Sequence, residues 1–377
     1  MKKIKFNTPH ITGKELHYIK DVFKENQFYG VGKYTSKCET IIKKKISSKN
    51  VLLTDSCTSA LEIAALIIKK TKSDEVIMPS YTFTSTASAF LKAGFKIKFV
   101  DVDPLTAMID PLKVYKLVNK NTRAIVVVHY GGNSSDILSI SKICKKNKII
   151  LVEDAAQAFD CFLNNKSLGT YGNFGCFSFH ETKNIHSGLA GALVIKNKKD
   201  FKRAVHIRDR GTDRDDMIRK YKKKYTWVEL GGSFYPTEIQ AAFLYSQLKK
   251  INENTKKRKS LFTLYVKNLS ELLKKNKIYF YLNNRNFKSN YHAMCIYLKS
   301  NKIRENLRRT LLTKGIQSTF HYMPLHSSKM GKSLGFKLND FPVTNNISKT
   351  ILRLPLHNNL SFKEIDYICN KIDYFFR

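Results

Sequence analysis

Lys183 is the residue whose surroundings in this sequence point most directly to chemistry. It lies in the segment Ser178-Phe-His-Glu-Thr-Lys183-Asn184, which follows an apolar run at 174–179 and precedes a flexible, glycine-containing segment at 187–192. Most of the 67 lysines and arginines must be solvated surface residues. A lysine between a buried strand and a glycine-containing loop is partly removed from water, so its amine can lose a proton and attack a carbonyl.

Three further groups at predicted strand ends could act together with this lysine. Asp154 follows an apolar run, where an unpaired carboxylate is costly and needs a cationic partner, although capping the next turn is an equal alternative. The segment 56–59 lies between a strand and a helix, where hydroxyls and free N–H groups bind phosphate but also serve as ordinary helix caps. Phe83 could stack on a ligand ring or belong to the core.

Taken together, these groups are those that pyridoxal 5′-phosphate (PLP) requires. The cofactor needs a lysine that bonds to its aldehyde, a carboxylate that keeps its pyridine nitrogen protonated, and a helix terminus that holds its phosphate. Lys183, Asp154 and the segment 56–59 supply these three functions. The pattern therefore predicts a PLP site.

Short apolar runs alternate with helical patterns through the first part of the chain, which predicts an α/β fold with a mostly parallel sheet covered by helices. The expected strands are 51–53, 76–78, 96–100, 125–128, 149–152 and 174–179, and the expected helices are 16–23, 60–70, 87–93, 137–146 and 201–210. Ligands bind outside the carboxyl ends of such strands. The loops that begin at residues 55, 79, 129 and 153 should therefore share one pocket.

The second part of the chain has a different pattern. A long helical pattern begins near Glu238 and runs toward Lys267, and the remainder predicts a smaller α+β unit. Its expected strands are 294–298 and 317–321, and its expected helices are 302–313 and 361–374. We expect a large domain at 1–250 and a small C-terminal domain at 251–377.

The net charge of +37 would ordinarily suggest binding to nucleic acid or to an anionic membrane. The basic residues occur in short runs along the whole chain, such as 43–45 and 222–224, so we interpret them as a composition bias of solvated positions. Seven cysteines without a Cys-x-x-Cys pair indicate reduced thiols and neither disulfides nor a metal site. No leader-like or membrane-spanning run is present, so we expect a cytoplasmic protein.

Two of these segments carry a resemblance to a known family. Asp154-Ala-Ala-Gln157 and the lysine segment 178–184 resemble those of the fold-type-I PLP sugar-nucleotide aminotransferases. The segments 53–58, 78–83, 225–227 and 321–326 are similar to those of members that make dTDP-4-amino-4,6-dideoxygalactose, a precursor of cell-surface polysaccharides. The resemblance runs from about Phe6 to the C-terminus. It implies amino transfer from L-glutamate to C4 of a dTDP-4-keto-6-deoxyhexose.

The resemblance also implies a role for each site residue. Lys183 would bond to PLP and move the proton, Asp154 would pair with the pyridine nitrogen, and Gln157 would lie beside the ring hydroxyl. The remaining cofactor contacts would be stacking by Phe83 and phosphate binding by Thr58, Ser59 and Ser178. Members are homodimers in which the loop around Ser233 would reach the partner's phosphate, and His321 and His326 would come from the small domain toward the substrate.

The segment behind the lysine departs from the family pattern Gly-Glu-Gly-Gly-Ala-Leu. Here it reads Gly188-Leu189-Ala190-Gly191-Ala192-Leu193, so a methyl group at Ala190 would strain the backbone if its φ is positive, and any contact of the missing Glu is lost. The alternatives are an aminotransferase for another sugar epimer or for C3, or a weakened relative that acts as a basic binding protein. Relatives that dehydrate the sugar carry histidine where this chain has Lys183.

Overall fold

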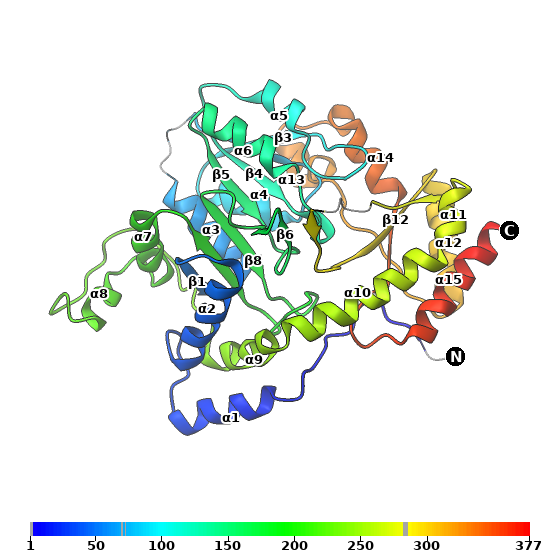
Figure 1. The fold of residues 1–377 in the computed structure, drawn as a ribbon. Helices are drawn as coiled ribbons and strands as arrows, with labels where there is room; N and C mark the ends of the chain where they lie inside the picture. The colour runs from blue at the N-terminus through cyan, green and yellow to red at the C-terminus, as the bar shows by residue number, and fades with distance from the viewer. Residues whose placement is uncertain (1–2, 69–70, 72, 282–285) are drawn as a thin grey trace.

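A seven-stranded sheet of order β1-β9-β8-β5-β4-β2-β3 forms the centre of the first part of the chain (Figure 1). The computed structural model describes residues 3–68, 71, 73–281 and 286–377. The strands are β1 Val51–Thr54, β2 Glu75–Pro79, β3 Lys96–Val100, β4 Thr122–Val128, β5 Ile150–Asp154, β8 Phe174–Ser178 and β9 Gly191–Ile195. Only β9 runs antiparallel to its neighbours, β1 and β8, so the prediction of a mostly parallel sheet is confirmed.

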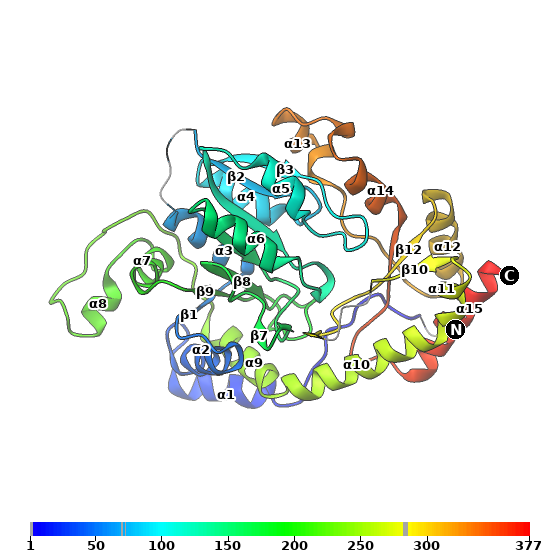
Figure 2. The same ribbon diagram turned by 45° about the horizontal axis from the view of Figure 1, so that its top comes forward.

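Helices cover both faces of this sheet, which explains why its strands are apolar on both sides. Successive residues of β1 alternate between the two cores: Leu52 packs with one face, and Val51 and Leu53 pack with the other. One face is covered by α3 Cys57–Ile67, α4 Thr84–Lys92 and α7 Lys198–Arg208. The other is covered by α2 Lys33–Ile46, α9 Glu238–Lys249, α5 Pro111–Leu117 and α6 Ile137–Lys146. Figure 2 shows these layers from a second direction.

A second, smaller sheet of order β10-β12-β13 lies toward the C-terminal end. Its strands Ile278–Tyr279, Met294–Leu298 and Ile351–Leu354 are antiparallel, and buried and partly buried side chains alternate along β12. The helices α10 Ile251–Asn268, α11 Ser270–Lys274, α12 Asn301–Thr313 and α15 Phe362–Phe376 share a core with this sheet. Both chain ends lie near this unit in Figure 1.

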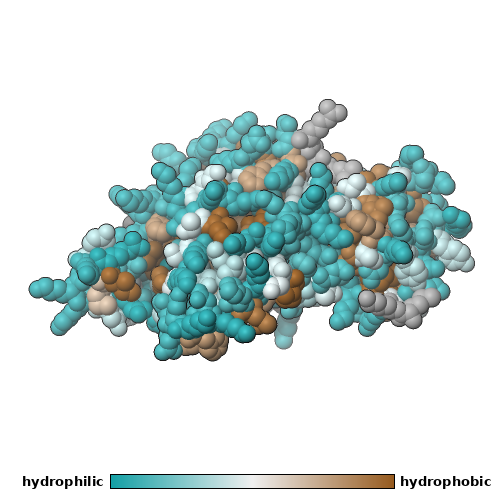
Figure 3. Space-filling model, turned by 60° about the horizontal axis from the view of Figure 1, so that its bottom comes forward, coloured by the Kyte–Doolittle hydropathy of each residue, from teal (hydrophilic) through white to brown (hydrophobic). Residues whose placement is uncertain are grey.

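The remaining elements connect these two units or extend from them. They are α1 Glu15–Glu25, α8 Arg214–Ile218, α13 Lys329–Ser333, α14 Pro342–Thr350, β6 Phe162–Leu163, β7 Lys166–Ser167 and β11 Phe287–Lys288. Residues 212–230, which include α8, form an arm that projects from the body in Figures 1 and 2. The arm carries exposed apolar side chains, among them Tyr221, Trp227 and Leu230. One of the brown patches on the mainly teal surface of Figure 3 lies at that end of the molecule.

Several predicted elements differ from the structure. The predicted helix at 60–70 corresponds to α3, which begins earlier, at Cys57, and residues 69–70 lie outside the described part of the chain. The helical pattern from Glu238 is confirmed as two successive helices that meet at Lys250. The predicted strand at 317–321 is wrong, because Thr319 makes only an isolated bridge with Arg353 before the chain turns toward the large sheet. No helix of the described residues is long and apolar enough to cross a membrane.

Candidate active site

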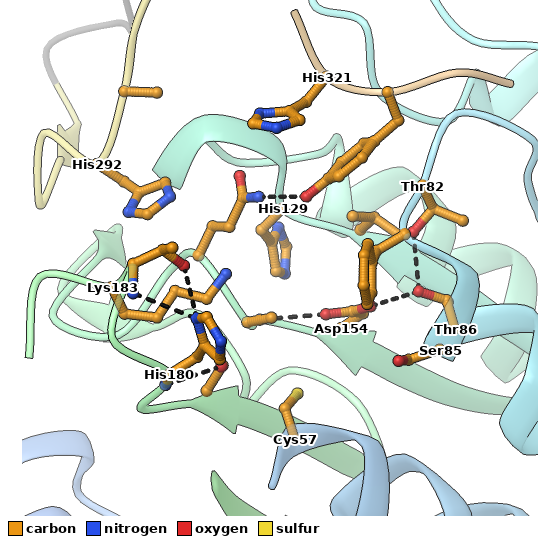
Figure 4. A pocket seen from close by; sticks show the side chains of 18 of the residues that line it. Cys57, Thr82, Ser85, Thr86, His129, Asp154, His180, Lys183, His292 and His321 are labelled. Carbon is orange, nitrogen blue, oxygen red and sulfur yellow. Dashed lines mark hydrogen bonds between the residues drawn. The ribbon is translucent and has the colours of Figure 1, made fainter. Parts of the chain in front are cut away.

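A cavity of about 440 Å³ lies at the edge of the sheet where the parallel strands end. It is lined by residues from the loops that follow β1, β2, β4 and β5, as the sequence predicted, and also by residues from the loop that follows β8 and by residues near the smaller sheet. Figure 4 shows His292 and His321 entering the cavity from the second part of the chain, with Lys183 and Asp154 below them in the view. The site is therefore built from both parts of the chain.

Lys183 lies on a loop that its own backbone holds in place. Beyond β8, Phe179 N donates to Ala190 O at 2.7 Å, Glu181 N donates to Gly188 O at 2.8 Å, and Lys183 N donates to His180 O at 2.8 Å. Desolvation in the cavity lowers the pKa of the Lys183 amine to about 8, although Asp154 and the Cys57 thiol favour the charged form. A positioned amine with this pKa can act as a nucleophile and as a proton carrier near neutral pH.

The segment behind Lys183 is not strained at Ala190, because the positive φ on which the expected strain depended is not found there. The left-handed conformation falls on Gly188, with φ 78°, and Ala190 is not among the residues with positive φ. The Ala190 methyl is buried in the core between the sheet and the N-terminal helices. Leu189 lines the cavity, and its carbonyl accepts a hydrogen bond from Gln240 Nε2 at 2.7 Å.

Asp154 ends β5 with its carboxylate turned into the cavity and only 5% exposed. Its Oδ2 accepts from Thr86 Oγ1 at 2.7 Å, and its Oδ1 accepts from Ala156 N at 3.1 Å, so it also caps the following turn. Burial raises the pKa of the Asp154 carboxyl, against the lowering effect of these hydrogen bonds. Among the described residues no cation forms an ion pair with it, so the site suits a positively charged ligand atom.

The helix α3 points its N-terminus at the same cavity. Ser56 is the ordinary cap, because its Oγ accepts from Ser59 N at 3.1 Å, while Thr58 lines the cavity and its Oγ1 lies 2.8 Å from Ser85 Oγ. A Cβ on Gly191 would lie 2.4 Å from the backbone N of Cys57, so β9 can approach this helix only with glycine. The unpaired N–H groups of the first turn and Thr58 therefore form a cradle that fits a phosphate.

The other predicted cofactor residues differ in position. Phe83 is 56% exposed and lines the cavity, so it is not a core residue, and Ser178 lines the cavity as well. Gln157 also lines it, but its Oε1 accepts from Gly131 N and its Nε2 donates to Tyr322 Oη, each at 2.7 Å. Ser59 and Ser233 are not lining residues: Ser59 bonds to Ser56, and Ser233 forms a bridge with Asp209 at the surface.

The two predicted substrate histidines have different surroundings. His321 lines the cavity, and its Nδ1 lies 2.6 Å from Nη1 of Arg353. His326 is fully buried outside the cavity lining, with Nδ1 2.6 Å from Ser80 Oγ and the ring 4.7 Å from that of Phe341. The position of His326 suits a structural tie between its loop and the end of β2, because the ring presents no face to the cavity.

Arg353, His292 and Tyr322 also line the cavity, and the sequence did not predict them as site residues. Arg353 had a signal, since a charged residue interrupts the apolar strand Ile351–Leu354. His292 precedes β12, and its Nδ1 lies 3.0 Å from Asn184 Oδ1, next to Lys183 in the chain. Nothing in the local sequence indicated that His292 would face the lysine.

The cavity fits PLP on its own geometry. It combines a half-buried lysine with a lowered pKa, a buried carboxylate without a cationic partner among the described residues, and a helix N-terminus. These are the three groups that bind the aldehyde carbon, the pyridine nitrogen and the phosphate of this cofactor.

Comparison with known proteins agrees with this geometry. Residues 9–373 match the DegT/DnrJ/EryC1/StrS aminotransferase family. GDP-perosamine synthase of Escherichia coli O157:H7 is 26% identical over 376 residues, covering 100% of this chain and 99% of the relative. UDP-4-amino-4,6-dideoxy-N-acetyl-beta-L-altrosamine transaminase of Campylobacter jejuni is 29% identical over 375 residues, covering 97% and 95%.

A solved structure shows that the fold is shared as well. The PMP form of a sugar aminotransferase from Streptococcus pneumoniae, Spr1654, superimposes with a TM-score of 0.92 at 23% identity, covering 99% of this chain and 97% of that chain. The chain therefore belongs to the DegT/DnrJ/EryC1/StrS aminotransferase family and is a PLP-dependent sugar aminotransferase.

Proposed function

We propose that this enzyme transfers an amino group from L-glutamate to C4 of a dTDP-4-keto-6-deoxyhexose, giving dTDP-4-amino-4,6-dideoxygalactose for a cell-surface polysaccharide. The observation that carries amino transfer is the presence of Lys183 and Asp154 in one cavity. The choice of C4 and of dTDP rests on the local similarity of the segments 53–58, 78–83, 225–227 and 321–326. The curated relatives named above act on GDP- and UDP-linked sugars by their names, so those nucleotides are the competing substrates.

Bound in this cavity, PLP would supply an electron-withdrawing ring that stabilises negative charge at the carbon that loses its proton. Asp154 would keep the pyridine nitrogen protonated, because a buried carboxylate favours a cationic neighbour. Lys183 Nζ would hold the cofactor at its aldehyde carbon, and the same amine would carry the proton to and from the reacting carbon.

The remaining residues orient the reactants. Thr58, Ser178 and the N–H groups of α3 would hold the phosphate, and Phe83 would supply an aromatic face for the ring. Gln157 is placed to face the ring hydroxyl, with its amide fixed by Gly131 and Tyr322. We assign the substrate side to His321 and give Ser59 and His326 structural roles, because they lie outside the cavity lining.

We further propose a homodimer of cytoplasmic subunits, each with a large domain at 1–250 and a small domain at 251–377. The exposed apolar side chains of the arm at 212–230 support a partner on this face, because isolated proteins rarely expose such clusters. Ser233 follows the arm and lies at the surface outside its own cavity lining, a position that suits contact with the partner's phosphate cradle.

The test is to incubate the PLP-loaded enzyme with glutamate and a panel of keto-sugar nucleotides that differ in nucleotide, epimer and keto position. Mass spectrometry and NMR of the products identify the aminated carbon. We expect a 4-amino product from dTDP-4-keto-6-deoxyglucose, formed faster than from the GDP- or UDP-linked sugars. A 3-amino product, or a clear preference for GDP or UDP, would overturn the proposed substrate but not the transaminase chemistry.

A further inference from the structure

Arg353 is a buried cation that lines the active-site cavity without a matching anion. The residue is on β13, is 8% exposed, and lines the same cavity as Lys183. Nη1 reaches His321 Nδ1 at 2.6 Å, whereas Nε is buried without any hydrogen-bond partner. No carboxylate of the described residues forms an ion pair with it. A buried charge left in this state is costly, and the missing partner is best supplied by a ligand.

Two other buried arginines of the same region show what a structural guanidinium looks like here. Arg258 donates to the carbonyl oxygens of Tyr291, His292 and Leu356 at 2.7–2.9 Å. Arg304 donates from Nη2 to Asn301 Oδ1 at 2.9 Å, and its charge is matched by a carboxylate oxygen of Glu305 3.0 Å from Nε, although Nε and Nη1 form no well-aligned hydrogen bond. Neither Arg258 nor Arg304 lines the cavity, so Arg353 differs from both in its position, and its hydrogen-bond partner is His321 Nδ1 in place of a carbonyl or carboxylate oxygen.

The neighbour of Arg353 is suited to hold it in one orientation. Desolvation, followed by the charges of Arg353 and Lys183, lowers the pKa of His321 to about 4. His321 is therefore neutral at neutral pH, and its Nδ1 can accept the Arg353 hydrogen bond. Arg353 keeps Nε without a partner, and the fork of N–H donors in a guanidinium matches the two oxygens of a carboxylate.

The position of Arg353 relative to Lys183 distinguishes the possible anions. Arg353 and Lys183 line the same cavity, and the positive charge of Arg353 contributes to the lowered pKa of the Lys183 amine. In an α-amino acid the carboxylate is attached to the same carbon that bears the amine. In a sugar nucleotide the diphosphate is attached to C1, across the sugar ring from C4. An anion site beside Lys183 therefore fits the amino acid better than the nucleotide.

We infer that Arg353 binds the α-carboxylate of the amino donor and selects α-amino acids over simple amines. This inference rests on the proposed function for the identity of the donor, glutamate. Arg353 is then a specificity-determining residue of the donor half of the reaction, and His321 is its positioning residue. The acceptor half, in which the sugar nucleotide is aminated, does not need this contact.

The test measures the two half-reactions separately on PLP-loaded enzyme, using the change in cofactor absorbance. Glutamate converts the PLP form, and the keto-sugar nucleotide converts the resulting amino form back. In Arg353→Gln we expect the KM for glutamate to rise roughly 30-fold or more, because a charge-assisted bidentate contact is lost. Arg353→Lys should fall between this variant and wild type, and the acceptor half-reaction should stay within about 3-fold of wild type in both.

Donor analogues and a matched control sharpen the test. 4-Aminobutyrate lacks the α-carboxylate, so wild type should strongly prefer glutamate over it, and Arg353→Gln should lose most of that preference. Arg304→Gln removes a similarly buried arginine outside the cavity lining and should change neither half-reaction. Thermal melting and the cofactor spectrum verify that each variant is folded and loaded.

Each outcome decides the inference. A selective loss in the acceptor half-reaction would assign Arg353 to the nucleotide diphosphate and overturn it, and so would unchanged kinetics with both substrates. If wild type reacts with glutamate but with no keto-sugar nucleotide, the proposed acceptor fails while the glutamate measurements still decide the role of Arg353. If wild type does not react with glutamate at all, the proposed donor and this inference both fail.

Discussion

The two sides of the cavity were predictable to very different extents. On one side, Lys183, Asp154 and Thr58 lie at or beyond the ends of strands of the large sheet, and their chemistry could be inferred from sequence segments of a few residues. On the other side, Arg353 and His292 come from the second part of the chain, and local sequence did not reveal them. The difference indicates that the cofactor side is encoded locally, whereas the donor side depends on how the smaller sheet is placed against the larger one.

The largest expected effect concerns the cofactor side. Lys183→Ala should lower the rate of amino transfer by about 10³-fold or more, because both the nucleophile and the proton carrier are removed. Steady-state assays with glutamate and the keto-sugar nucleotide measure it. Lys196→Ala changes a lysine just beyond β9 that does not line the cavity and serves as the control. Equal rates in the two variants would remove Lys183 from the mechanism.

Asp154→Asn should have the next largest effect, lowering kcat by about 100-fold or more while PLP still binds. The amide cannot stabilise a positive charge on the pyridine nitrogen, although it can keep the hydrogen bond from Thr86. Asp74→Asn is a suitable control, because Asp74 is also buried but pairs with Arg123 at the opposite edge of the sheet. The prediction fails if Asp154→Asn retains wild-type kcat or if Asp74→Asn loses as much.

The lowered pKa of Lys183 predicts a pH dependence of cofactor capture. The amine binds the aldehyde only when neutral, so in cofactor-free enzyme the rate of covalent PLP capture should rise with pH and level off above about 8. Between pH 7 and pH 9 the neutral fraction grows roughly 10-fold. Stopped-flow absorbance over this range measures it. A rate that keeps increasing beyond pH 10 would mean that the amine is not desolvated.

The smallest effect concerns the backbone behind the lysine. Gly188→Ala should destabilise the fold by about 1 kcal/mol, because a methyl group is unfavourable at its positive φ. Ala190→Gly should bring no gain in stability, since Ala190 has no such conformation and packs in the core. Chemical denaturation of both variants measures the two values. A stabilised Ala190→Gly would restore the idea of strain at that position.

The strands of the large sheet could be predicted from the sequence, whereas β9 and the position of Arg353 could not. The strands of the large sheet were found because they are short apolar runs between turns, and the strand-end loops follow from the geometry of parallel sheets. The antiparallel β9 was missed because Gly191 and Ala192 resemble a loop. Arg353 interrupts an apolar strand, but its place at the cavity depends on the pairing of β12 with β13 and on the bridge between Thr319 and Arg353. Such long-range pairing leaves no local pattern.

The most direct test of the central claim, that Lys183 is the covalent anchor of PLP in this cavity, is to map the point of attachment. The PLP-loaded enzyme is reduced with borohydride, digested and analysed by peptide mass spectrometry. We predict one modified peptide, which contains Lys183, and its disappearance when glutamate is added before reduction. A cofactor fixed to another lysine, or spread over many, would contradict the account of the active site.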